Sequence, residues 1–287
     1  MLGPSSNIAV VAPSGIFDPE RLAKGMDLVR SWGHQLVEGR NLRARHRYTA
    51  GTVAARLADL DWALTAPDVD AVWFARGGYG TAHLLEGIRW AHLDSRPVIG
   101  FSDATALFCG MLARGRGRAI HGPVLHSLAD LCDVESQEAC RAVLDGGAVN
   151  LPVRAHGTGK TVRAPVVGGN LCVMASLVGT PWALRAHGCI VVIEDVGEAP
   201  YRVDRLLHQI LASGGLEGAV AVVMGEFQGC SSPEGADWGI QDVIADLLAA
   251  HDIPLWTGLP VGHGTQNHAW PVGGSATLDV DGLRFLP

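Results

Sequence analysis

The chain has 287 residues, 48% of them hydrophobic, so it can bury one large core or two cores of ordinary size. Its formal net charge is −7, it holds only two lysines, Lys24 and Lys160, and its arginines are scattered, which excludes a surface for nucleic acid. No apolar run approaches the ~18 residues of a membrane span, and the first residues lack the cationic region of a signal peptide. We therefore expect a globular, cytoplasmic protein whose partner is neither a membrane nor a nucleic acid.

The first half of the chain alternates strand-like with helix-like segments. A helix is predicted to begin after Asp18, with Pro19 at its first helical position, and to end at Gly33. Two further helices are predicted, one over residues 57–64 and one from about Thr81. The predicted strands are residues 8–12, 35–37, 71–75, 98–101 and 119–121. This alternation indicates a doubly wound parallel sheet with crossover helices.

A segment near the middle of the chain, residues 145–165, is rich in glycine and polar residues and shows neither a helical nor a strand period. We place a domain boundary there. The predicted division is an N-terminal α/β domain over residues 1–148, a linker over 149–164 and a second domain over 165–287. The second domain is expected to be smaller and richer in β-structure, with strands at 189–193 and 219–224, a helix at 205–211 and a hairpin turn at Asp281–Gly282.

The six cysteines are far apart and none is in CxxC spacing. They are Cys109, Cys132, Cys140, Cys172, Cys189 and Cys230. Several fall inside apolar segments, which is typical of reduced core thiols rather than disulfides or a zinc site. The sequence also lacks an HExxH motif, so we expect no metal ion.

Ser102 is the best candidate for a nucleophile. It lies between a short apolar strand and an apolar helical run in the segment PVIGFSDATALFCGML. A serine at a sharp strand-to-helix junction has its hydroxyl lifted out of the sheet, beside the first free N–H groups of the helix. The alternative is that Ser102 merely caps the helix that follows.

A serine nucleophile requires a base, and His263 is the strongest candidate among the 12 histidines. It stands between glycines in VGHGTQNHAW, with no amphipathic helix around it, so it is expected to project from a loop. His121, at a predicted strand end, and His268 are weaker candidates.

The base in turn requires an orienting carboxylate, and Glu194 follows the apolar run CIVVI directly. The carboxyl end of a buried strand is where α/β proteins place active-site residues. Asp195 and Glu198 compete with it. Each of the three acids could instead cap the next helix or pair with Arg202 or Arg205.

The glycines of RGGYG, residues 76–80, follow a predicted strand and open the next helix. They allow the backbone to bend and to approach a ligand closely, so the N–H of Gly78 could donate to an oxyanion. The alternative is a tight turn without a ligand. The spacing does not match a dinucleotide-binding Gly-x-Gly-x-x-Gly motif.

Eight motifs, taken together, resemble the signature blocks of the LD-carboxypeptidase family of serine peptidases, in the order of that family. They are APSG (12–15), ARGGYG (75–80), IGFSDATAL (99–107), HGP (121–123), GGNL (168–171), GTPW (179–182), IEDVGEAPYRVDR (193–205) and GHGTQNHAWPVG (262–273). The resemblance covers nearly the whole chain. The turn GFSDA lacks the second glycine of the Gly-x-Ser-x-Gly elbow, which argues against an α/β-hydrolase.

The resemblance implies a Ser-Glu-His triad at Ser102, Glu194 and His263, and an oxyanion hole formed by the backbone N–H groups of Gly78 and Asp103. It implies an N-terminal flavodoxin-like α/β domain joined to a smaller β-rich domain, with the active site at their interface. It also implies that neither a cofactor nor a metal is required.

The activity implied by the family is the removal of a terminal D-alanine from an L-configured centre of a murein tetrapeptide, through an acyl-enzyme, by a cytoplasmic homodimer. Arg76 and Arg202 are the arginines nearest to the motifs and are candidate anchors for the carboxylate of this small peptide. One alternative is a microcin-immunity-type amidase, which would use the same triad on a peptidyl-adenylate or a related N-acyl substrate. A second alternative, from another class, is a non-catalytic protein that binds a small molecule on the same scaffold.

Overall fold

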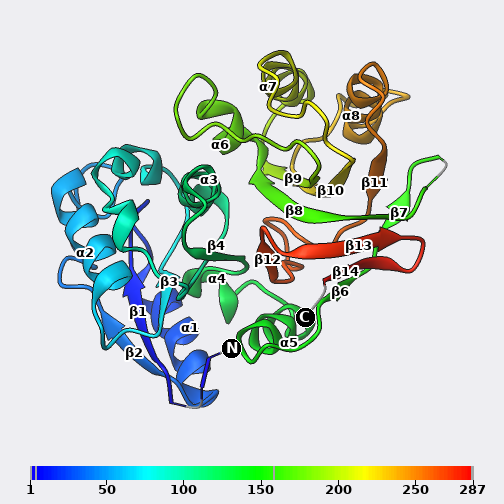
Figure 1. Cartoon of the computed structure of the whole chain (residues 1–287). Helices are drawn as coiled ribbons and strands as arrows, with labels where there is room; N and C mark the ends of the chain where they lie inside the picture. The colour runs from blue at the N-terminus through cyan, green and yellow to red at the C-terminus, as the bar shows by residue number, and fades with distance from the viewer. Residues whose placement is uncertain (1, 4, 158, 286–287) are drawn as a thin grey trace.

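Five parallel strands form most of the first sheet, which occupies the N-terminal half of the computed structural model (Figure 1). The model describes residues 2–3, 5–157 and 159–285. The strands are β1 (Asn7–Val11), β2 (Gln35–Glu38), β3 (Ala71–Phe74), β4 (Pro97–Gly100) and β5 (Arg118–His121). In space they run in the order β5-β4-β3-β1-β2. The five predicted strands and the doubly wound parallel arrangement are therefore confirmed.

Helix α1 (Pro19–Ser31) begins as the sequence predicts. The carboxylate of Asp18 accepts hydrogen bonds from the backbone N–H groups of Glu20 and Arg21, and Gly33 ends the segment with a φ of +98°. The remaining helices of this half are α2 (Val53–Thr65), α3 (Thr105–Arg114), α4 (Leu125–Leu128) and α5 (Val134–Leu144). The helix predicted from Thr81 is wrong in type, because Thr81–Gly87 forms a 3₁₀ helix that starts after Gly80 at a φ of +130°.

The second sheet has eight strands and combines parallel with antiparallel pairing. Its strands are β6 (Asn150–Leu151), β7 (Arg154–Ala155), β8 (Val162–Asn170), β9 (Ile190–Val196), β10 (Ala221–Gln228), β11 (Leu255–Thr257), β13 (Ser275–Asp279) and β14 (Gly282–Phe285). Strands β8 to β11 are parallel to one another, and the others pair antiparallel. The predicted hairpin at Asp281–Gly282 is confirmed by the pairing of Asp279 with Gly282.

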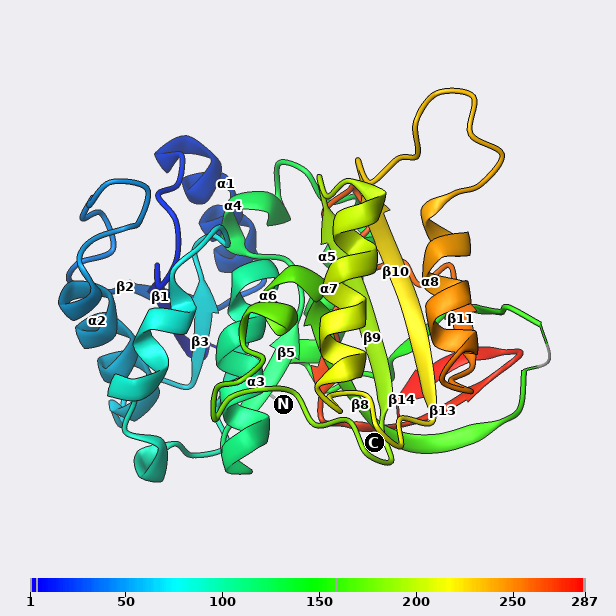
Figure 2. The ribbon, with the colours of Figure 1, turned by 90° about the horizontal axis from the view of Figure 1, so that it is seen from above.

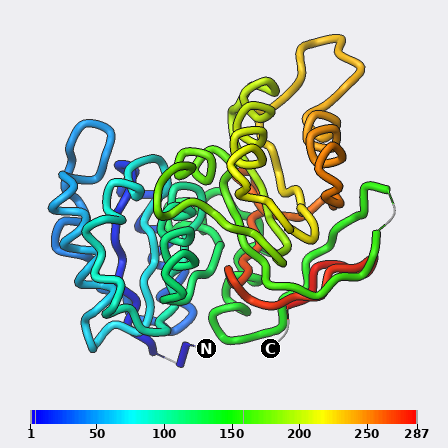
Figure 3. The backbone as a smooth tube through the Cα atoms, turned by 45° about the horizontal axis from the view of Figure 1, so that its top comes forward, coloured from blue at the N-terminus to red at the C-terminus, as the bar shows by residue number. Residues whose placement is uncertain are grey.

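The segment predicted as a linker contains regular structure. It holds β6, β7 and the first residues of β8, and only its Thr158 lies outside the described residues. Figure 3 shows the C-terminal hairpin, in red, beside the green segment that holds β6, with which β14 pairs. The stretch is therefore part of the second sheet.

Three helices accompany the parallel strands of the second sheet. They are α6 (Leu171–Ser176), α7 (Pro200–Ala212) and α8 (Ile240–Ala249). Figure 2 shows α7 and α8 lying over β9 and β10. The second domain therefore has more helix than expected, although the mixed α/β class with two domains is as predicted. No helix of the described residues combines the length and the apolar character that crossing a membrane requires.

The two halves are joined by one strand of the C-terminal half that pairs with the first sheet, and by close packing. Strand β12 (Trp270–Val272) comes from the C-terminal half but pairs antiparallel with β5 at the edge of the first sheet. Helix α3 packs on α6 and β8. This approach needs glycine on β8, because a Cβ at Gly169 would lie 2.6 Å from Thr105 Oγ1. The two sheets are consequently in close contact, through α3 on β8 and through β12 on β5.

Candidate active site

Ser102 directly follows the extended Phe101 after strand β4 and opens the turn that leads into α3. Its φ is +60°, a left-handed conformation that is uncommon for a residue other than glycine. Such a conformation costs about 1–3 kcal/mol and tends to occur at functional sites. Gly77 packs against it, since a Cβ there would meet Ser102 Cβ at 2.9 Å and Oγ at 3.0 Å. Ser102 is half-buried.

Glu194 lies on β9 with its side chain fully buried, at 0% exposure, while the side chain of His263 is 16% exposed. The Nδ1 of His263 donates a hydrogen bond of 2.7 Å to Oε2 of Glu194. The two residues are 69 positions apart, and the structure brings them together as the sequence predicts. In the neutral ring this bond assigns the proton to Nδ1 and leaves Nε2 as an acceptor.

The electrostatic environment of His263 favours its charged form. Burial alone would lower the pKa of its imidazole, but the carboxylate of Glu194, with those of Asp195 and Glu226, outweighs burial and raises that pKa above 6.5. Glu226 also holds the loop in place, because its Oε2 accepts the backbone N–H of Gly264 at 2.8 Å. An imidazolium formed during a reaction would therefore be stabilised.

The imidazole of His263 also packs against the ring of Phe101, with 4.7 Å between ring centroids. Phe101 is the residue before Ser102, so the candidate base lies beside the backbone that carries the candidate nucleophile. Ser102 lies in the turn that follows β4 of the first sheet, whereas Glu194 lies on β9 of the second. The candidate site thus lies at the interface between the two halves.

The two competing acids have other partners. The carboxylate of buried Asp195 accepts hydrogen bonds from the Asn170 side chain and from the backbone N–H groups of Cys172 and Val196, at 2.8–3.0 Å. Burial raises the pKa of Asp195 to about 6. Glu198 pairs with Arg202 at 3.4 Å. Asp195 therefore stabilises the start of α6. Glu198 makes the ion pair with Arg202 that the sequence analysis gave as its alternative role.

Of the two backbone groups expected to form an oxyanion hole, Asp103 follows Ser102 directly, and Gly78 follows Gly77, which packs against Ser102. Gly78 is exposed with a φ of +111°, and among the described residues neither its N–H nor that of Asp103 donates to a protein acceptor. The buried carboxylate of Asp103 accepts the backbone N–H of Thr81 at 2.8 Å. This bond fixes the glycine loop relative to the turn that holds Ser102.

Arg56 is a supporting residue that the sequence analysis missed. Its guanidinium is buried and donates to the carbonyl oxygens of Pro13, Gly51 and Gly80, which joins three loops around the glycine turn. A Cβ at Gly80 would lie 2.7 Å from Arg56 Nη1. A charged residue in a helix is ordinarily solvent-exposed, so the sequence held no signal for this role.

The remaining candidates lie outside the Glu194–His263 pair. Arg76 is exposed, next to the glycine loop, and its guanidinium donates to the carbonyl oxygen of Ile16. Arg202 is exposed on α7 in its ion pair with Glu198. His268 makes no side-chain hydrogen bond to a described residue, and burial lowers its pKa.

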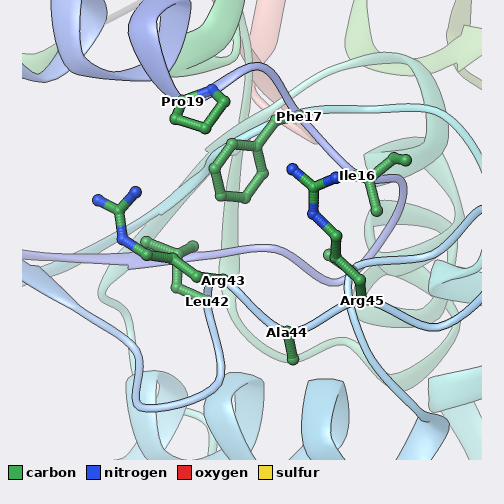
Figure 4. Close-up of a pocket in the computed structure, with 8 residues that line it drawn as sticks. Ile16, Phe17, Pro19, Leu42, Arg43, Ala44 and Arg45 are labelled. Atoms are coloured by element: carbon green, nitrogen blue, oxygen red, sulfur yellow. The ribbon is translucent and has the colours of Figure 1, made fainter.

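A small cavity of about 80 Å³ lies near Arg76, between the loop after β1 and the loop after β2 (Figure 4). Its lining is mostly apolar, with Ile16, Phe17 and Leu42, and Arg43 and Arg45 also line it. It includes none of the triad candidates. All six cysteines are free, and within the described ranges no three His, Cys, Asp or Glu side chains are grouped to hold a metal ion.

Comparison with known families matches both halves of the chain, in order. The LD-carboxypeptidase N-terminal domain matches residues 8–122, and the LD-carboxypeptidase C-terminal domain matches residues 163–278. The fold and the matches define a two-domain α/β peptidase. The murein tetrapeptide carboxypeptidase of Pseudomonas aeruginosa is 38% identical over 292 residues, which cover 97% of this chain and 94% of that protein. The chain belongs to the LD-carboxypeptidase family.

Solved structures agree with this assignment. Muramoyltetrapeptide carboxypeptidase from Oxalobacter formigenes superimposes with a TM-score of 0.86 and 28% identity, covering 96% of this chain and 97% of that one. The microcin C7 self-immunity protein in complex with glutamyl sulfamoyl guanosine superimposes with a TM-score of 0.90 at 19% identity, covering 100% and 97%. The second likeness concerns the fold alone.

Proposed function

We propose that this protein is a serine carboxypeptidase that uses Ser102 as nucleophile, His263 as base and Glu194 as orienting acid. The observation that carries the proposal is the 2.7 Å hydrogen bond from His263 Nδ1 to the fully buried Glu194, beside the Phe101–Ser102 backbone. Strain at Ser102 and the free N–H groups of Gly78 and Asp103 support the same assignment.

The proposed reaction has two halves. The Oγ of Ser102 bonds to the carbonyl carbon of the substrate while its proton passes to Nε2 of His263, and the N–H groups of Gly78 and Asp103 stabilise the oxyanion. The C–N bond then breaks, and His263 returns the proton to the leaving amine. Water attacks the resulting ester in the same way, with His263 again as base, and releases the acid and Ser102. No step uses a metal ion or cofactor, so turnover should survive chelation.

The proposed substrate is a murein tetrapeptide, which loses its terminal D-alanine from an L-configured centre. The 38% identity to a murein tetrapeptide carboxypeptidase supports this choice. Arg76, exposed beside the glycine loop, is the better-placed candidate to bind the terminal carboxylate, because Arg202 is already paired with Glu198. A cytoplasmic location and a homodimer remain predictions.

The test is incubation of the purified protein with murein tetrapeptide, followed by mass spectrometry for the loss of one alanine. Ser102→Ala should reduce turnover by about 10³-fold or more and leave the free energy of unfolding within about 1 kcal/mol, because only one hydroxyl is lost. Substantial activity in a folded Ser102→Ala protein would contradict the serine mechanism.

The same assay separates the alternatives. A microcin-immunity-type amidase would leave the tetrapeptide intact and cleave a peptidyl-adenylate analogue in a Ser102-dependent manner. A non-catalytic binding protein would cleave neither substrate but would bind one of them in calorimetry. The lower identity of 22% to the microcin C7 self-immunity protein favours the carboxypeptidase.

A further inference from the structure

His121 lies next to the proposed triad, in the interface between the two sheets. It is the last residue of β5, opposite Gly100 of β4 and Trp270 of β12, and it is fully buried. Its ring stacks on Trp270 with 5.1 Å between centroids and an interplanar angle of 19°. Its other neighbour is Phe101, at 6.0 Å. The ring is therefore held on two sides by aromatic side chains, one of which also contacts His263.

Four buried polar atoms of His121, Glu194 and Trp270 have no partner among the described residues. They are Nδ1 and Nε2 of His121, Oε1 of Glu194 and Nε1 of Trp270. Burial of a carboxylate is costly unless hydrogen bonds compensate both oxygens, and His263 compensates only Oε2. Buried polar groups in native proteins nearly always find a partner, directly or through an ordered water. Glu194 thus lacks a second donor, and His121 has one to offer.

The charge state of His121 fits that role. Burial lowers the pKa of its imidazole to about 4, with Glu194 acting to raise it and His263 acting to lower it. These effects also place both triad residues within electrostatic range of the ring. A neutral imidazole carries one N–H donor and one acceptor nitrogen, so it can donate to a carboxylate without adding a competing charge.

We propose that His121 is a positioning residue for the triad, whose ring N–H donates to Oε1 of Glu194 through one buried water. This inference rests on the proposed function of Ser102, Glu194 and His263. The second hydrogen bond holds the carboxylate in the plane that presents Oε2 to His263 Nδ1. The stack on Trp270 fixes the direction of the donor.

The variants that test the proposal separate the hydrogen-bond donor of His121 from the aromatic stacking of its ring. His121→Phe keeps an aromatic ring for the stack on Trp270 but removes both nitrogens, whereas His121→Asn and His121→Gln keep a side-chain N–H. His34→Phe is the matched control, because His34 is also buried and has an unpartnered Nδ1 but lies outside the machinery. Ser102→Ala in the same assay tests the proposed function itself.

We expect His121→Phe to lower kcat by about 10- to 100-fold with little change in KM, and the better of the two amide variants to recover part of that loss. The acidic limb of the kcat/KM profile should move to higher pH, because the carboxylate without its second donor binds the imidazolium of His263 more strongly. His34→Phe should leave both readouts unchanged. If Ser102→Ala is inactive but His121→Phe has the kcat and the pH profile of the wild-type protein, the proposed role of His121 alone is overturned. If Ser102→Ala is active, the proposed triad is overturned.

A measurement on the unaltered protein decides the matter if His121→Phe fails to fold. In NMR spectra of protein labelled with ¹⁵N in histidine, His121 should appear as a neutral ring with one slowly exchanging, downfield N–H between pH 5 and 8. A His121 that titrates in that range, or whose ring protons exchange freely with water, would overturn the proposal.

Discussion

His263 and Glu194 fix how activity should depend on pH. Because the pKa of His263 is raised above 6.5, its neutral, proton-accepting form predominates only at a higher pH than in an ordinary histidine. The sign for stability is opposite, since the ion pair contributes fully below pH 6.5 and its contribution is lost as pH rises through the folded pKa. We therefore expect kcat/KM to rise with pH over the range in which this contribution to unfolding free energy declines. Parallel pH series of kinetics and urea denaturation measure both.

Glu194→Gln provides the sharpest test of the same pair. The amide keeps the shape but removes the charge, so burial should now dominate and lower the pKa of His263. We expect kcat to fall by about 10²- to 10⁴-fold, with a smaller effect on KM and with the acidic limb moved to lower pH. A variant with wild-type kcat would place the orienting acid elsewhere.

The neighbouring acids should respond differently to the same change. Asp195→Asn places an NH₂ group among three N–H donors, so we expect it to lower the free energy of unfolding by about 1–3 kcal/mol. Glu198→Gln loses one ion pair, at 3.4 Å, whose Arg202 partner is 51% exposed, and it should cost less than about 1 kcal/mol. Most of the activity should remain in both, as measured by kinetics and urea denaturation on one preparation. A dead Glu198→Gln enzyme would require a new triad.

Sequence reasoning at this scale could place Ser102, Glu194 and His263 as candidates because strand ends and glycine-flanked loops leave local signals. It could not choose between Glu194 and Asp195 from periodicity, since β9 is buried on both faces. Sequence reasoning also identified His121 only as a weaker candidate for the base. The contacts of that ring come from Trp270, which is far along the chain.

At the scale of elements, helix α3, which follows Ser102, packs closely on β8, the neighbour of the strand that carries Glu194. The backbone N–H of Asn170 donates to Thr105 Oγ1 at 3.1 Å, at the point where Gly169 leaves room for the threonine. Gly169→Ala should push α3, and with it Ser102, away from the second sheet. We expect kcat to fall by about 10-fold or more and the free energy of unfolding to fall by about 1–3 kcal/mol.

Gly188→Ala is the control for Gly169→Ala. Gly188 also has a positive φ, +71°, but no atom lies within 4 Å of an added Cβ. It should therefore show the conformational strain without the displacement and retain its kcat. Equal losses of kcat in the two variants would mean that backbone strain, rather than the fit of α3 on β8, controls activity.

Elements with strong local signals were the ones that could be predicted. Asp18 and Pro19 mark the start of α1, and the apolar runs of β1 to β5 alternate with crossover segments. Strand β8 follows a glycine-rich polar stretch, its first residues are partly exposed, and its Gly169 makes the contact with α3, so its sequence lacks a clear strand pattern. Strand β12 has three residues including a proline, and only its pairing with β5 makes it a strand.

At the scale of the whole molecule, the pairing of β12 with β5 leads us to expect that the two halves unfold together. Trp270 is fully buried between His121 of the first sheet and Phe285 of the second. Trp270→Ala should lower the free energy of unfolding by about 3–5 kcal/mol, in one transition that circular dichroism and fluorescence follow alike. Trp238→Ala, at a site 42% exposed, should have little effect. Two separate transitions in the wild-type protein, with only one affected by Trp270→Ala, would contradict this view.

The position of β12 also determines when, during translation, the enzyme becomes complete. The ribosome makes Ser102 and β5 early, and β5 stays an open sheet edge until residues 270–272 follow. Glu194 and His263 are likewise made after the nucleophile. A nascent or prematurely terminated chain that ends before residue 263 therefore carries the proposed nucleophile without its proposed base and without the strand that pairs with β5. On the proposed assignment, we expect hydrolysis only from chains in which residues 263–272 have been made.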